Sequence, residues 1–417
     1  MQAYSTPIQR TLLQLLRRPD ESRTQPAPVG LNPAEWEALR TEAGRQDVMP
    51  LLYYRLQSRP ERTAIPTSIL ASLQHAFLKN TAYIALLYHE LRQILSACEQ
   101  EGIPVILLKG SYLAKQVYPE PGLRPMRDMD LMVRPWDLAR AGAVSEKLGY
   151  ALNHPYNIEV ETAVSRDIPT YKKRGVFGIE WHWRLSDPGD PLTFEPDELW
   201  ERAVPMRVEG VSCFGLAPED LLLHLAFHLA GHHLCSVPLR FLVDIDIVLG
   251  ADSQRLDWQV LIDRARRWHW ERCVYLTLRL ATECFGTPLP ERVLTTLVPE
   301  PVEDEVMGWA YEQLFAGPVP KPQRMTTNLV QVWKQPGLVQ RLRLLWAKVF
   351  TSPLAMSREF GVHPDSLALW RYYPLRLWIL MQRYGRQVLR LWWQDPAQRA
   401  VLERYSNRNA LERWLER

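Results

Sequence analysis

The stretches VILLKGSYL (105–113) and RPMRDMDLMV (124–133) decide the fold of this chain of 417 residues. The first is a short apolar run that leads into a helical pattern, which predicts a strand, a tight turn at Gly110-Ser111 and a helix. The second contains another apolar run, from Met129 to Val133, and predicts a further strand. Together they predict a mixed α/β core over residues 101–216.

Two aspartates lie on that further strand, where side chains alternate between the faces of a sheet. Asp128 and Asp130 are therefore expected on one face, about 6 to 7 Å apart along the chain. Paired carboxylates of this kind suit divalent cations, and hard oxygen ligands select Mg²⁺ or Mn²⁺ together with substrate phosphates. Gly110 and Ser111 would offer backbone N–H groups and a hydroxyl at a helix N-terminus, which is a phosphate-binding arrangement.

A third strand pattern, GIEWHW (178–183), supplies another acid. Glu180 and His182 share one face of this strand, opposite a face of apolar residues. An acid inside such a strand is costly unless a metal or hydrogen bonds compensate it. Glu180 is thus a candidate to complete a two-metal site, with a cross-strand ion pair as the alternative, and His182 is a candidate for binding the acceptor.

Helical periodicity predicts helices on both sides of this core: an N-terminal helical segment (1–100) and a larger C-terminal helical region (217–417). Residues 158–164 alternate in polarity and predict a strand, and Glu209-Gly210 predicts a hairpin turn. The expected helices are Thr11–Arg18, Pro33–Arg45, Thr81–Glu99, Tyr112–Val117, Trp136–Leu148, a helix from Pro218, Pro238–Leu249, Asp257–Trp268, Glu271–Phe285, Val302–Phe315, Leu329–Val349 and Pro374–Trp393.

Composition excludes several classes of protein. Fifty Lys plus Arg against 47 Asp plus Glu leave a net charge of +3, so a whole-molecule nucleic-acid footprint is not expected. Five cysteines without a CxxC pair fit neither a disulfide framework nor a zinc ribbon. No signal peptide or long apolar run is evident. The sequence therefore predicts a cytoplasmic protein.

In their order, five motifs resemble the poorly characterised bacterial nucleotidyltransferase family of the DNA-polymerase-β-like superfamily. They are LKGSYL, RPMRDMDLMV, IEWHW, HLAFHLAGHH and RFLVDIDIVL, within residues 30–350. The resemblance implies an α+β, nucleotidyltransferase-like mixed β-sheet core. It also implies that Gly110 and Ser111 form the phosphate turn, that Asp128 and Asp130 bind Mg²⁺ or Mn²⁺, and that Glu180 is the third acid.

Cationic residues around these motifs have two interpretations each. Lys109 either binds a phosphate as a point charge or lies on the surface. Arg127, and more weakly Arg124, either binds the triphosphate or pairs with Asp128 and Asp130. The interval from Gly-Ser to Asp-x-Asp is longer than in compact members of the superfamily, and both arginines lie in the added length.

Three histidines and an aspartate follow at intervals of four residues: Asp220, His224, His228 and His232. They are expected along one side of a single helix. A zinc-protease helix is excluded because no glutamate follows the first histidine. Asp244 lies on an apolar side of a later helix, where an acid needs a partner such as one of these histidines. We expect His228 and Asp244 to form either a structural pair or part of an acceptor site.

A basic, aromatic segment occupies residues 367–394, with five arginines, seven aromatics and no acid. Packing against its own domain is the favoured interpretation. Peripheral contact with an anionic membrane is possible from this composition but is not favoured, and nucleic-acid binding is less favoured still.

The favoured function is a metal-dependent, ATP- or other NTP-binding transferase that moves a nucleotidyl group to an acceptor hydroxyl or phosphate, releasing pyrophosphate. The acceptor is unknown, with a small molecule, sugar or modified peptide favoured over nucleic acid. One alternative is a degenerate binding or scaffold protein with the same core. Another is a transferase with a sugar-nucleotide donor, since Asp-x-Asp also binds metal-diphosphates.

Overall fold

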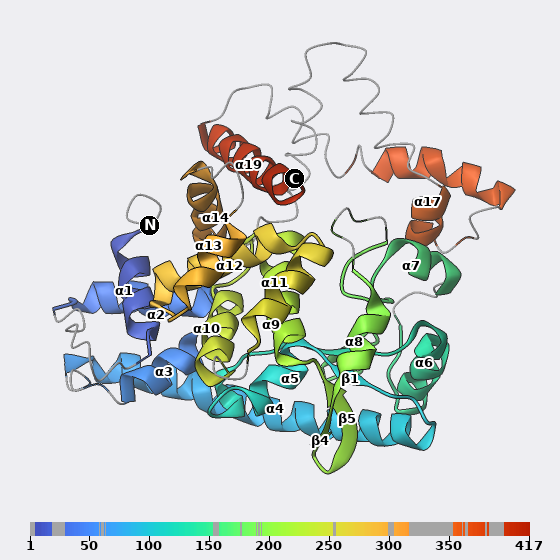
Figure 1. Ribbon diagram of the computed structural model, residues 1–417, viewed down its shortest axis with the longest axis horizontal. Coiled ribbons are helices and arrows are strands. Elements are labelled where there is room, and N and C mark those ends of the chain that lie inside the picture. Colours follow the sequence, from blue (N-terminus) through green and yellow to red (C-terminus); the bar gives the residue numbers. More distant parts are fainter. Residues whose placement is uncertain are drawn as a thin grey trace.

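The protein was analysed as a computed structural model, shown in Figure 1. The structure describes residues 5–18, 30–298, 304–316, 353–379, 382 and 396–417, apart from short gaps at 58, 60, 61, 63, 153–157, 176, 189, 191, 193, 253–255, 361 and 363–365. The expected helix Leu329–Val349 lies outside the described residues, as does most of Pro374–Trp393, whose described part is helical through residue 379.

A five-stranded mixed sheet forms the centre, in the order β3-β2-β1-β5-β4. Its strands are β1 (Ile106–Leu107), β2 (Asp128–Met132), β3 (Gly178–His182), β4 (Val204–Val208) and β5 (Val211–Gly215). Strand β2 pairs antiparallel with β1 and parallel with β3, whereas β5 pairs parallel with β1 and antiparallel with β4. The predicted mixed α+β architecture is confirmed.

Most predicted elements are present with shifted ends. The strand, turn and helix of the first motif are β1 and α5 (Lys109–Gln116), and the hairpin β4–β5 turns at Glu209 and Gly210, both with positive φ (49° and 81°). The other helices up to the hairpin are α1 (Pro7–Leu16), α2 (Pro33–Arg45), α3 (Met49–Gln57), α4 (Thr67–Gln100), η2 (Pro121–Leu123), η3 (Pro135–Asp137), α6 (Leu138–Lys147), α7 (Ile158–Val164) and α8 (Pro196–Arg202).

The strand expected at residues 158–164 is wrong, because this segment is helix α7. Thr162 Oγ1 donates to the carbonyl of Ile158, four residues earlier, which is a hydrogen bond typical of a threonine on a helix. The open edge of β3 is occupied instead by residues further along the chain. Ile168 and Tyr171 donate their N–H groups to Trp181 and Ile179 of β3. A period-two pattern over a few residues cannot tell these outcomes apart.

The C-terminal region is helical, as predicted. Its described elements are α9 (Pro218–Ala226), η4 (Phe227–His232), α10 (Arg240–Asp252), α11 (Trp258–Arg267), α12 (Glu271–Phe285), α13 (Glu291–Leu297), α14 (Asp304–Ala316), α17 (Pro353–Phe360), η5 (Leu367–Arg371) and α19 (Pro396–Leu415). None of the described helices has the length and apolarity to cross a bilayer. All five cysteines are buried and unpaired.

Two hydrophobic cores lie on the two faces of the sheet. Leu107, Leu131 and Trp181 pack against α4 and α6 on one face, where α4 runs beneath the sheet (Figure 1). Ile106 and Met132 join the second core on the other face, with α5, α9, α10 and α12. Because strand side chains alternate, this second face also receives the acids of β2 and β3.

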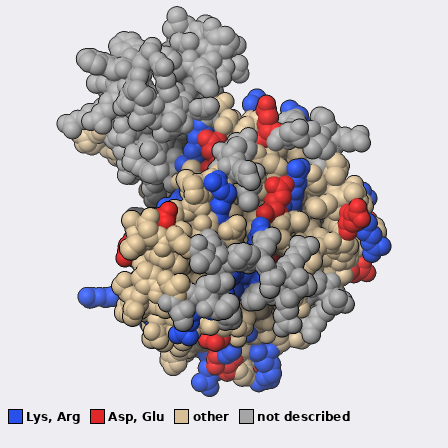
Figure 2. All heavy atoms as spheres, turned by 90° about the vertical axis from the view of Figure 1, so that its left-hand side faces the viewer, with Lys and Arg blue, Asp and Glu red and all other residues tan. Residues whose placement is uncertain are grey.

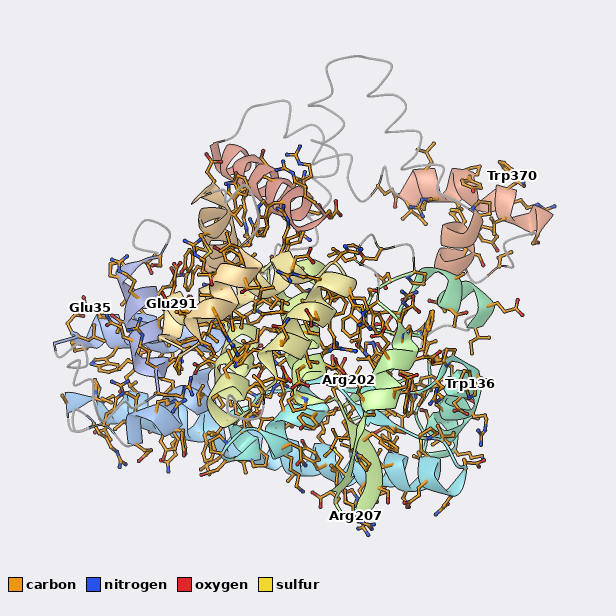
Figure 3. All side chains as sticks on the ribbon, in the orientation of Figure 1. Glu35, Trp136, Arg202, Arg207, Glu291 and Trp370 are labelled. Carbon is orange, nitrogen blue, oxygen red and sulfur yellow. The ribbon has the colours of Figure 1, made fainter. Side chains whose placement is uncertain are left out.

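Lys, Arg, Asp and Glu side chains are interspersed on the face drawn in Figure 2, and no patch of a single sign dominates it. The tip of the β4–β5 hairpin, marked by Arg207, lies at one extremity of the molecule in Figure 3, whereas Arg202 lies near its middle.

Gln46, between α2 and α3, ties the N-terminal helices to the start of α10. Its side-chain oxygen accepts the N–H of Leu239 at 2.6 Å and its carbonyl accepts the N–H of Arg240 at 3.2 Å. The amide nitrogen of the same side chain donates to Glu42 at 3.0 Å. A fully buried glutamine therefore fixes where α10 begins.

Replacing this glutamine tests the link. Gln46→Ala leaves the buried N–H of Leu239 without a partner, and we expect the free energy of unfolding to fall by about 1 to 3 kcal/mol. Urea denaturation measures the loss. Gln93→Ala is the matched control, because Gln93 bonds only to His89 on its own helix. Equal stability of the two variants would contradict the assigned role of Gln46.

Candidate functional site

Three polar side chains meet on the second face of the sheet. The parallel register of β2 and β3 sets Asp130 opposite Glu180 and Met132 opposite His182. Ligand atoms of Asp130, Glu180 and His182 all lie within 4.8 Å of one another. Asp128 precedes Asp130 by two residues on the same face and is half-buried. The sequence predicted these four residues individually, and the sheet brings them together.

The donor atoms suit a divalent cation. His182 Nε2 lies 3.0 Å from Asp130 Oδ1 and 3.9 Å from Glu180 Oε2. Carboxylate and imidazole ligands bind Mn²⁺ and related ions, and carboxylates alone also bind Mg²⁺. His182 is the third member of this group of ligand atoms, beside Asp130 and Glu180. From the sequence we expected His182 to bind the acceptor.

Burial and the neighbouring charges shift the pKa values of the three acids. Burial raises the pKa of Glu180 to about 7, with the charges of Asp130 and Asp128 adding to the rise. Burial and the Asp130 charge also raise the pKa of Asp128. Burial acts in the same direction on Asp130, but Lys109 and the His182 hydrogen bond outweigh it and hold its pKa well below the ordinary range. A bound cation would relieve this repulsion.

Lys109 is buried and belongs to the site. Its Nζ donates to Asp130 Oδ1 at 2.6 Å, so the surface alternative is wrong. Its φ of 40° lies in the left-handed region, and this strained conformation begins α5. No lysine or arginine of the described chain lies within 4.0 Å of the Glu180 carboxylate, which argues against the cross-strand ion pair for Glu180.

The Gly110-Ser111 turn packs tightly against the segment that leads into β2. A Cβ at Gly110 would collide with the side chains of Arg124 and Met126, so only glycine fits here. Ser111 is buried, and its Oγ has no hydrogen-bond partner among the described residues. A buried hydroxyl without a protein partner is a candidate donor to a ligand.

Arg124 and Asp244 form a buried ion pair that the sequence did not predict. Arg124 Nε and Nη2 donate to the two carboxylate oxygens of Asp244, each at 2.8 Å, and the Tyr118 hydroxyl donates to Oδ1 at 2.7 Å. The expected pairing of Asp244 with His228 is therefore wrong, since no hydrogen bond links them among the described residues. Asp244 is fully buried in this pair, and no hydrogen bond of Arg124 to Asp128 or Asp130 is found among the described residues.

Arg127 lies outside this buried network. Its guanidinium donates to Asp47 at 3.1 Å and its side chain is 76% exposed. Pairing of Arg127 with Asp128 or Asp130, one of the two interpretations from the sequence, is not observed.

The histidine row (His224, His228 and His232) runs beside the site, with neighbouring ring centroids 6.0 and 5.8 Å apart. The expected single helix is instead α9 continued by the π-helical turn η4. Burial lowers the pKa of each of the three, and the Lys109 charge contributes for each. The rings are therefore neutral at pH 7. Both ring nitrogens of His224 lack partners among the described residues.

Arginines contact both ends of the stretch from Asp220 to His232. Asp220 pairs with Arg264 at 2.6 Å and with Arg202 at 3.0 Å, and Figure 3 shows Arg202 near the middle of the molecule. The Arg166 guanidinium lies 2.7 Å from Nδ1 and 2.8 Å from Nε2 of His232. No sequence pattern indicated Arg166, whose position depends on the loop before β3.

Comparison with known proteins agrees with this geometry. The family model described as an uncharacterised nucleotidyltransferase matches residues 32–286, which is more than half of the chain. The chain belongs to this family. The match includes the whole sheet, the acids and the histidine row, and confirms the resemblance given by the sequence motifs. No curated protein and no solved structure is significantly similar to the chain.

The raised pKa of Glu180 predicts a pH dependence of stability. Protonation of Glu180 favours the folded state, because its pKa is about 7 there and about 4.5 when unfolded. This contribution of Glu180 to the free energy of unfolding is on the order of 2 kcal/mol. It is fully present below about pH 4.5 and is lost as pH rises through 7. Melting of metal-free wild type and Glu180→Gln between pH 5 and 8 checks this.

We expect the stability of the wild type to fall more steeply with pH than that of Glu180→Gln. We also expect Mn²⁺ to stabilise the wild type increasingly over the same range, because the ion competes with the proton. Parallel curves of stability against pH for the two proteins would contradict the raised pKa of Glu180.

Proposed function

We propose that this protein is a metal-dependent nucleotidyltransferase that transfers a nucleotidyl group from a nucleoside triphosphate to an acceptor hydroxyl or phosphate. The observation that carries the proposal is the convergence of Asp130, Glu180 and His182 beside the Gly110-Ser111 turn. Membership of the nucleotidyltransferase family supports the same reaction class.

The acids of β2 and β3 would hold Mg²⁺ or Mn²⁺. Asp128, Asp130 and Glu180 supply the carboxylates, and His182 adds an imidazole on the same side. Divalent ions in such a site stabilise charge on the phosphates and lower the pKa of an attacking hydroxyl. The carboxylates of Asp128 and Asp130 would bind ions together with the triphosphate, and Glu180 would complete the site for transfer.

The start of α5 would bind the polyphosphate. It offers its first backbone N–H groups, a Ser111 hydroxyl without a partner among the described residues, and the Lys109 ammonium, which contacts Asp130. Anions bind well at a helix N-terminus of this kind. With Asp130 bound to a cation, the Lys109 ammonium would be available to contact a phosphate oxygen.

In the transfer, an acceptor oxygen forms a bond to the α-phosphorus while the bond from that phosphorus to the bridging oxygen of the β-phosphate breaks, and pyrophosphate leaves with the electron pair. The acceptor's proton passes to a nearby base or to water. His224 and His228 are too weakly basic for this task, since efficient bases have pKa values near the working pH. Neutral imidazoles instead suit the orientation of an acceptor hydroxyl.

We propose a small molecule, sugar or modified peptide as the acceptor, because a net charge of +3 provides no whole-molecule footprint for a long nucleic acid. Incubation of the protein with each NTP and Mg²⁺ or Mn²⁺, with measurement of pyrophosphate release and a mass scan of co-purified acceptors, tests the function. Metal-dependent nucleotide binding without turnover under every condition would favour the scaffold alternative.

Asp128 offers the cleanest test of the acids. Asp130→Asn would leave the buried Lys109 unpaired and is expected to cost stability, about 3 to 5 kcal/mol. Asp128 has no such ion pair among the described residues, so Asp128→Asn should fold normally. We expect it to lower metal-dependent transfer by at least about 100-fold, measured as pyrophosphate release.

The control for this variant is Asp263→Asn, an exposed acid on α11, which should retain wild-type turnover. Normal turnover in Asp128→Asn would remove Asp128 from the proposed site.

His228 tests the role of the histidine row. If His228 orients the acceptor, His228→Ala lowers the transfer rate by about 100-fold and leaves nucleotide binding intact. Stability should fall only by the cost of the cavity that the buried ring leaves, because Asp244 keeps Arg124 and Tyr118 and no buried charge loses its partner. Single-turnover kinetics beside a thermal melt separate the effects, with His89→Ala on the exposed side of α4 as control. A large fall in melting temperature with normal turnover would give His228 a purely structural role.

A further inference from the structure

Arg240, the first residue of α10, is a buried arginine whose charge is only loosely paired. Its side chain is 10% exposed, its guanidinium lies 4.4 Å from the ring centre of Phe241, and its Nε has no hydrogen bond among the described residues. The carboxylate contacts are long: 3.9 Å from Nε to Asp47 and 4.0 Å from Nη1 to Asp244. Because buried N–H groups are normally hydrogen-bonded, the unsatisfied Nε has capacity for a further acceptor.

Both neighbouring acids already have other partners. Asp244 accepts two hydrogen bonds from Arg124 and one from Tyr118. Asp47 accepts from Arg127. Burial lowers the pKa of Arg240, and the charge of Arg124 lowers it further. Local acids therefore do not fully compensate the charge of Arg240, and an added anion would be stabilised here.

The backbone fixes Arg240 in this position. The N–H of Arg240 donates to the carbonyl of Gln46. Asp47, the residue after Gln46, has a φ of 55° in the left-handed region. The turn between α2 and α3 thus holds the start of α10 and places an acid beside the guanidinium. These backbone contacts position the arginine at the start of α10. Figure 1 shows α10 beside α9, on the sheet face that carries the acids.

Arg240 lies one ion pair away from the Gly110-Ser111 turn. Its Nη1 is 4.0 Å from Asp244, which binds Arg124 at 2.8 Å, and the side chain of Arg124 packs against Gly110. Lys109, the residue before Gly110, contacts Asp130 at 2.6 Å. A polyphosphate bound at this turn would therefore have both Lys109 from α5 and Arg240 from α10 in its neighbourhood.

We propose that the Arg240 guanidinium binds phosphate oxygens of the nucleotide's polyphosphate, as a phosphate-binding residue contributed by the C-terminal helical region. The inference rests on the proposed nucleotidyltransferase function and adds a specific ligand to it. Guanidinium presents a fork of donors that matches phosphate, and Arg240 has donors to spare. Asp47 and Asp244 are positioning residues, close enough to orient the guanidinium and too far away to saturate it.

Binding of inorganic pyrophosphate with Mn²⁺ to the full-length protein, measured by calorimetry, tests the proposal. Arg240→Gln should weaken pyrophosphate binding by about 10- to 100-fold, the worth of a charge-assisted hydrogen bond. Affinity for Mn²⁺ alone, measured by electron paramagnetic resonance, should stay within about 3-fold, because the ion is held by the acids. Circular dichroism establishes folding.

Arg18→Gln is the matched control. Arg18 also pairs with an acid of α10, Asp246 at 3.0 Å, so its loss disturbs the same helix. It should leave pyrophosphate affinity unchanged. Arg240→Lys keeps the charge but loses the fork, and it should still weaken binding about 3- to 10-fold. This variant carries the test if Arg240→Gln does not fold.

Wild-type affinity in folded Arg240→Gln or Arg240→Lys would overturn the inference and give Arg240 a structural role. Loss of affinity in Arg127→Gln with none in Arg240→Gln would overturn it in favour of Arg127. Failure of the wild type to bind pyrophosphate or any NTP with Mg²⁺ or Mn²⁺ would overturn the proposed function itself, and the inference with it.

Discussion

The parallel pairing of β2 with β3 sets Asp130 beside Glu180, and the repulsion between these partly buried carboxylates is the constraint on which the site depends. Without a cation the repulsion is met from within the chain, by the Lys109 ammonium and a hydrogen bond from His182. The position of Lys109 in turn requires a strained backbone at the start of α5. The strand–turn–helix motif therefore serves both the acids and the phosphate turn.

The second constraint is the Arg124–Asp244 pair, which joins the sheet domain to the C-terminal helices. Arg124 lies in the segment that lengthens the interval between the Gly-Ser turn and Asp-x-Asp, and its side chain packs against Gly110. The longer interval thus lets an arginine reach α10 while it supports the turn. Removing either partner would leave a buried charge, which is far more costly than the loss of a surface pair. The Gly110-Ser111 turn and α10 are consequently fixed relative to each other, and Arg240 is placed with them.

Local sequence patterns predicted much of the fold. The apolar run before Lys109, the alternation around Asp130 and the Glu209-Gly210 turn each act over a few residues, and the structure contains the corresponding strands, helix and hairpin. The prediction was wrong for residues 158–164, where a short alternating pattern is compatible with either structure and the edge of β3 is taken by a later segment. The histidine row was correctly placed on one side, although a π-helical turn interrupts the expected helix.

The sequence by itself determined that Asp128 and Asp130 share a face, that a Gly-Ser turn precedes them and that an acid and a histidine share a face of a later strand, because these relations follow from the period of a strand. Only the tertiary structure decided which charges meet. Arg124 and Asp244 are 120 residues apart in the chain, and no local pattern could show that Asp244 takes an arginine and a tyrosine in preference to a histidine. The loose pairing of Arg240 likewise exists only after folding, since Asp47 and Asp244 lie nearby but already accept hydrogen bonds from other residues.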